Sequence, residues 1–167
     1  MATKDVPAGK VPPQSLDAEK SLLGAVLIDD EVLADATEFV SIGDFYDKRH
    51  EIVFDAMMRL YEKHKPVDLL TLTDELKRKK ELETIGGSAY LSELTTYVPT
   101  AAHAASYAEI VAQKAVRRRL IRASGDISEL GYDENTTTQE LLEKAEAELF
   151  SVSDQSLKQD VISLESI

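Results

Sequence analysis

Apolar residues in the last third of the chain recur at intervals of three and four, the period of one face of an α-helix. A first stripe lies between Pro99 and Gly131 and consists of Ala105, Ala108, Ala112, Val116, Leu120, Ala123, Ile127 and Leu130. A second stripe follows Thr137, whose spacing from Glu140 fits a capping box, and it consists of Leu142, Ala145, Leu149 and Val152. The two stripes predict a helical hairpin over residues 104–152, in which each helix offers an apolar seam to the other.

Residues 15–103 carry shorter stretches of the same period, separated by caps and helix breakers. Ser15 is placed to cap a first helix, and Gly86-Gly87 opens a later one. The most regular stripe, from Phe45 to Tyr61, contains His50 and is the expected centre of the core. Alternation typical of strand hairpins is missing. The sequence therefore predicts an all-α protein, with a small body of about five to six helices followed by a projecting two-helix antiparallel hairpin.

The two ends of the chain differ from the middle. Residues 1–14 hold Pro7, Pro12 and Pro13, and we expect a flexible leader there. Residues 153–156 are polar, after which Val161, Leu164 and Ile167 resume a helical spacing. Residues 153–167 are therefore expected to begin a linker toward a further domain.

Composition narrows the function classes. The 167 residues suit one domain, or one domain with an appendage, and 43% of them are hydrophobic. The chain has no cysteine, which excludes disulfides, a thiolate nucleophile and a cysteine zinc site. No apolar run is long enough for a membrane span and the N-terminus lacks the apolar centre of a secretory signal, so we expect a cytoplasmic protein without membrane contact.

Residues that could carry chemistry are few. The one Gly-Lys pair, Gly9-Lys10, lacks both the upstream glycine and the following Ser or Thr of a phosphate-binding loop. His50, His64 and His103 are not at metal-ligand spacing, and His50 on an apolar face is expected to be a hydrogen-bonded core residue. We therefore assign no catalytic, cofactor-binding or metal-binding residue.

A basic run in the first limb of the hairpin allows two interpretations. Arg117, Arg118, Arg119 and Arg122 fan out by about 100° per residue, so they flank both sides of the seam. They can pair with acids of the second limb, or of another subunit's hairpin, at Glu140, Glu143, Glu146 and Glu148. Alternatively, this limb and Lys77–Lys80 form a module that binds single-stranded DNA. The net charge of −12 opposes binding to phosphates, and no aromatic residues for base stacking interrupt the run, so the first interpretation is preferred.

Many short sequences occur in one order at compatible spacings. They are Val11–Glu19, Leu23–Val26, Asp44–Tyr46, Ile52–Met57, Pro66–Asp68, Gly86–Leu94, Val98–Ala102 and Ile110-Val111 leading to Arg118–Ile121. In this order they resemble the N-terminal domain of the bacterial replicative hexameric DNA helicase family, DnaB. The resemblance covers nearly all of the chain from Val11 to Val152, although no single motif in it carries catalytic chemistry.

The resemblance implies an assembly module. In that family, hairpins pair subunits and the domains form a collar on a ring of ATP-driven motor domains. It implies self-association from dimer up to hexamer, primase as a partner and a helicase loader as a further one, with DNA contact only weak or in the intact ring. ATP and Mg²⁺ would belong to the motor domain, which this sequence lacks. The candidate partner-contact residues are Tyr90, Arg118, Ile121 and Arg122.

Overall fold

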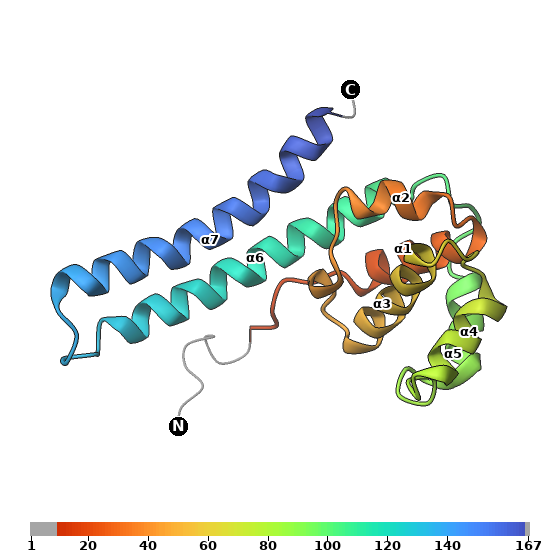
Figure 1. Cartoon of the computed structure of the whole chain (residues 1–167), viewed down its shortest axis with the longest axis horizontal. Helices are drawn as coiled ribbons and strands as arrows, with labels where there is room; N and C mark the ends of the chain where they lie inside the picture. Colours follow the sequence, from red (N-terminus) through yellow and green to blue (C-terminus); the bar gives the residue numbers. More distant parts are fainter. Residues whose placement is uncertain (1–9, 166–167) are drawn as a thin grey trace. The chain divides into compact units, whose positions relative to one another are not determined.

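The computed structural model describes the backbone of residues 10–165 and the side chains of residues 10–155. This part of the chain forms seven α-helices, one 3-10 helix and no strand, which confirms the all-α prediction (Figure 1). The elements are α1 (Leu16–Ile28), α2 (Val32–Thr37), η1 (Ile42–Asp44), α3 (Lys48–Glu62), α4 (Leu69–Arg78), α5 (Gly87–Thr95), α6 (Ala104–Leu130) and α7 (Thr138–Glu165).

The chain divides into two compact units. Within the described backbone, residues 14–114 form one unit, which we call the body, and residues 115–165 form the other together with residues 10–13. We call the α6–α7 part of the second unit, residues 115–155, the arm. Within it, α7 runs back alongside the second half of α6 (Figure 1), as the sequence predicted for the hairpin.

Local caps explain where the helices begin. The Ser15 hydroxyl accepts a hydrogen bond from the backbone N–H of Ala18 (3.2 Å), as predicted. The expectation that the core helix starts near Phe45 was wrong, because residues 42–44 form a 3-10 turn and Asp47 caps α3 by accepting from the N–H of Arg49 (2.9 Å). The capping interaction fixes the start of α3 more strongly than the apolar pattern does.

The second hairpin helix does not end at Val152, where its apolar stripe ends. It continues to Glu165, so the polar residues 153–156 do not interrupt it. No Gly or Pro stands there, and the Ser153 hydroxyl donates to the carbonyl of Leu149 inside the helix (3.3 Å). Polar composition signalled a solvated helix instead of a break. The side chains of Val161 and Leu164, Ile167 as a whole, and residues 1–9 of the expected leader lie outside the described residues.

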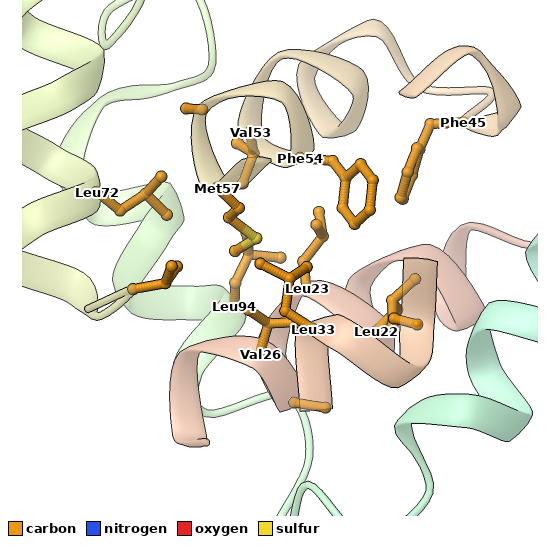
Figure 2. Close-up of a cluster of buried hydrophobic side chains, with 14 of the residues drawn as sticks. Leu22, Leu23, Val26, Leu33, Phe45, Val53, Phe54, Met57, Leu72 and Leu94 are labelled. Atoms are coloured by element: carbon orange, nitrogen blue, oxygen red, sulfur yellow. The ribbon is translucent and has the colours of Figure 1, made fainter. Parts of the chain in front are cut away.

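The core of the body lies among α1, α3, α4 and α5. The Phe45 and Phe54 rings pack with their centroids 4.9 Å apart. Figure 2 shows the side chains that converge on this cluster, among them Leu22, Leu23, Val26, Val53, Met57, Leu72 and Leu94, all fully buried. Helix α6 also begins in this core, since its first turns bury Ala104, Ala108 and Val111.

An ion-pair cluster links α3 to α4 at the rim of this core. Arg59 of α3 donates to Glu75 (2.9 Å) and Glu81 (2.7 Å), and Arg78 donates to Glu75 (2.7 Å). Hydrogen bonds from Arg78 and then Arg59 lower the pKa of Glu75 to about 2. Arg78, part of the basic run 77–80, is thus held in a local ion pair of the body.

Helices α1 and α5 cross at close range beside Gly24. A Cβ atom added at Gly24 would lie 2.4 Å from the carbonyl oxygen of Leu94, which is backbone and cannot rotate away. Gly24 is buried within α1, and Leu94 is fully buried in the core. Only glycine therefore allows this crossing.

We expect Gly24→Ala to lower the free energy of unfolding by about 1–3 kcal/mol, because α1 and α5 must separate to admit the methyl group. Urea unfolding followed by circular dichroism measures this. Gly125→Ala is the matched control, because nothing lies within 4 Å of a Cβ there and alanine favours a helix interior by up to about 1 kcal/mol. Equal stability of Gly24→Ala and the wild type would contradict the close crossing.

Candidate functional site

The contact between α6 and α7 in the arm is narrower than the two stripes predicted. Ala123 is buried, and Val116, Ile127, Leu130, Leu141, Ala145 and Val152 are half-buried. Three residues assigned to the seam are not covered by it: Leu120, Leu142 and Leu149 are 50%, 60% and 51% exposed. A stripe of three-four spacing spans a wide arc of the helix surface, and a single neighbouring helix covers only part of it. Ala105, also predicted on this stripe, is exposed on the first turn of α6.

A polar groove of about 170 Å³ follows one edge of this contact. Small and apolar side chains, Ala123 and Val152, line it together with polar ones. The polar lining residues are Arg119, Arg122 and Asp126 from α6 and Glu148, Ser151 and Gln155 from α7. The groove thus holds two guanidinium groups and two carboxylates, so its formal charges cancel.

The exposed leucines lie on the other edge of the contact. Each residue turns about 100° around a helix, so Arg122 and Leu120 lie on opposite sides of Ala123. The same spacing puts Ser151 and Leu149 on opposite sides of Val152. Since Arg122 and Ser151 line the groove, the leucines face away from it. We call the set of Leu120, Ile127, Leu142 and Leu149 the apolar edge of the arm.

Three of the four predicted partner-contact residues lie on α6 in the arm. Ile121 is 45% exposed, and Arg122 is exposed and lines the polar groove. Arg118 donates a hydrogen bond to the carbonyl of Pro13 (2.7 Å), a residue of the same unit. The groove brings Arg122 and Glu148 together, while the ion pairing predicted between the two limbs stays a prediction.

Tyr90, the fourth predicted contact residue, belongs to the body and is only 8% exposed. Its hydroxyl lies 2.6 Å from Nε2 of His50, and Nδ1 of His50 lies 2.6 Å from Oε2 of Glu19. Burial is the main cause that raises the pKa of the Tyr90 hydroxyl. The guanidinium of Arg49 lies over the Tyr90 ring, 4.5 Å from its centroid. Tyr90 is therefore a core residue in this structure, and its role as a partner contact stays a prediction.

Glu19 completes this buried network and was not singled out from the sequence. Its carboxylate accepts hydrogen bonds from the backbone N–H groups of Tyr46 (2.6 Å) and Asp47 (3.3 Å). A carboxylate is an acceptor, so we assign the Nδ1 proton of His50 to the Glu19 contact and let Nε2 accept from Tyr90. His50 is fully buried and hydrogen-bonded, which confirms its predicted place in the core. The sequence does hold one indication that Glu19 is buried: it precedes Leu22 and Leu23 by three and four residues, which puts it on their face of α1.

None of the helices in residues 10–165 is long and apolar enough to cross a membrane. No group of three or more His, Asp or Glu side chains within the described residues is arranged to hold a metal ion.

The chain is all-α, and its shorter helices are followed by a two-helix hairpin formed by α6 and α7. The chain belongs to the family described as "DnaB-like helicase N terminal domain", whose model matches residues 11–113. A solved structure supports this assignment over a longer stretch: the crystal structure of the N-terminal domain of DnaB helicase from Mycobacterium tuberculosis is 42% identical, with a TM-score of 0.82. That likeness covers 84% of this chain and 99% of the other.

Full-length relatives show the same relationship. The replicative DNA helicase DnaB of Leifsonia xyli subsp. xyli is 43% identical over 155 residues, which is 93% of this chain and 34% of the relative. That of Geobacillus stearothermophilus is 44% identical over 86% of this chain and 32% of the relative. That of Rhodothermus marinus is 42% identical over 96% and 17%. The chain thus spans about a third, or less, of the length of these relatives.

We expect Tyr90→Phe to lower the free energy of unfolding by about 1–2 kcal/mol, because it leaves the buried Nε2 of His50 without a donor. Urea unfolding measures this. Tyr97→Phe is the matched control: the Tyr97 hydroxyl donates to Asp17 (2.5 Å) at an exposed site, so its loss should cost less than about 0.5 kcal/mol. Equal effects of the two substitutions would contradict the structural role of the Tyr90 hydroxyl.

Proposed function

We propose that this chain is the assembly module of a replicative DNA helicase. It joins subunits into a collar through its arm and offers a docking surface to primase. The family assignment and the names of the relatives support the helicase context. ATP-dependent unwinding in the 5′ to 3′ direction belongs, in this proposal, to a full-length protein with a motor domain. We assign ATP-dependent unwinding to no residue of this chain.

The observation that supports assembly best is the apolar edge. Its three leucines are half or more exposed, and they lie side by side along two helices instead of singly. Leu120 and Ile127 are two helical turns apart on α6, as are Leu142 and Leu149 on α7. A second arm turned about a two-fold axis presents the same edge and covers it, which gives a four-helix bundle. The occupant of the edge is therefore a second copy of this chain.

Primase docking concerns a different side of α6. Ile121 is about 200° from Ala123 around the helix, so it points away from α7 and from the apolar edge. Arg118 and Arg122 are its neighbours on this surface. An exposed isoleucine between arginines is the composition of an interface centre, where apolar side chains and arginine are enriched. We propose that primase binds there, on a surface that pairing of arms leaves open.

Binding of single-stranded DNA by the basic limb is less well supported. The polar groove sets two carboxylates beside its two arginines, and the chain as a whole carries a charge of −12. Affinity for a phosphate backbone needs an excess of positive charge. Assembly therefore explains the charged residues of the arm better than binding of single-stranded DNA does.

We expect Leu142→Asp/Leu149→Asp to convert the chain to a monomer of 18.5 kDa, while the wild type runs at a higher mass. Each substitution places a charge on the surface that a second arm would bury. Light scattering after size exclusion, over a range of concentrations, measures this. Ser151→Asp is the matched control, because it adds a charge to α7 on the groove edge and should leave assembly unchanged. A monomeric wild type would contradict the proposed assembly.

For primase, we expect Ile121→Ala/Arg122→Ala to weaken binding of the C-terminal domain of a primase about tenfold or more, as loss of central interface residues does. Co-migration on size exclusion and a titration measure this. Ser124→Ala, an exposed position of the same helix, should have no effect. If the double variant binds as the wild type does, the proposed docking surface is wrong.

A further inference from the structure

A short segment near the N-terminus is bound to helix α6. The Nη1 atom of Arg118 donates a hydrogen bond to the carbonyl oxygen of Pro13, which lies 105 residues earlier in the chain, at 2.7 Å. Residues 10–13 accordingly belong to the same compact unit as the arm, whereas Gln14 begins the body. The donor is charged and both residues are half-buried, which makes this hydrogen bond stronger than a neutral one in water.

The segment holds apolar side chains in the solvent. Val11 is 67% exposed, and Pro12 is exposed as well. The rings of Pro12 and Pro13 fix their φ angles, so part of the backbone conformation is set before any partner binds. Because less conformational freedom is then lost on binding, such a segment is well suited to a place in an interface.

Arg118 brings this segment to one particular face of α6. Arg117 and Arg118 precede Ile121 by four and three residues, which puts the three side chains on one side of the helix. Ile121 is 45% exposed and points away from Ala123, and therefore away from α7. We call residues 10–13 together with Arg117, Arg118 and Ile121 the N-terminal surface.

The N-terminal surface is positive, although the chain as a whole carries a charge of −12. Lys10, Arg117 and Arg118 give this set of residues a charge of +3, and the set contains no acid. Val11 and Ile121 are its exposed aliphatic side chains. Charge complementarity selects a protein partner that has carboxylates around an apolar centre. Single-stranded DNA is the poorer match, because this set lacks aromatic side chains on which bases could stack.

We propose that residues 10–13 are part of the surface on which primase docks, with Val11 in contact with the partner and Arg118 as the residue that positions the segment. This inference rests on the proposed docking of primase and adds a second segment of the chain to it. It also states the chemistry of the partner's docking face, an apolar patch beside carboxylates.

A double-mutant cycle on the whole chain tests this, with the C-terminal domain of a primase as the probe in a calorimetric titration. We expect Val11→Asp to weaken binding about tenfold, because it sets a carboxylate against those of the partner. In an Arg118→Ala chain, which no longer holds the segment on α6, the same change should weaken binding less than about threefold. Leu70→Asp is the matched control, because Leu70 is an aliphatic residue of the body that is 79% exposed, and its replacement should leave binding unchanged.

Ile121→Ala distinguishes failure of this inference from failure of the proposed function. If Ile121→Ala weakens binding and Val11→Asp does not, the N-terminal segment lies outside the interface, while docking on α6 stands. If neither change has an effect, the proposed docking of primase fails as well. Equal effects of Val11→Asp with and without Arg118 would overturn the positioning role of Arg118. Weaker retention of single-stranded DNA by Val11→Asp, with unchanged binding of the primase domain, would assign the surface to nucleic acid and overturn the inference.

Discussion

The buried carboxylate of Glu19 is the constraint on which the body depends. It accepts hydrogen bonds from His50 and from two backbone amides just before α3. His50 in turn is hydrogen-bonded to the Tyr90 hydroxyl. One side chain of α1 thereby fixes α3 and α5. A polar group in the interior costs free energy unless such hydrogen-bond partners surround it. The backbone of α1 at Gly24 also lies close to the backbone of α5 at Leu94. Neither helix can therefore shift without disturbing the network.

The sequence predicted what local chemistry determines. Ser15 capped its helix, Gly131 followed the end of α6, and His50 lay in the core as its apolar setting indicated. It did not predict Glu19, because the partners of that carboxylate come from residues 27 or more positions later in the chain. The end of α7 was missed because polar residues were taken for a break, whereas only Gly, Pro or a cap would have ended the helix.

The arm shows where periodicity stops being informative. Spacing of threes and fours says that Leu120, Leu142 and Leu149 share a stripe with Ala123 and Val152. It does not say how many helices cover that stripe. One neighbour covers the part around Ala123 and leaves the leucines exposed, so the same pattern describes both a closed hairpin and half of a four-helix bundle. The apolar stripe is wider than the surface that one neighbouring helix covers, and this width, unlike the period, favours the bundle.

The charges of the body and the arm follow different rules. In the body, acids lie beside bases, as Glu75 lies between Arg59 and Arg78. In the arm, eight acids gather at one end and four arginines at the other. Within a single arm this arrangement sets like charges close together and so works against stability.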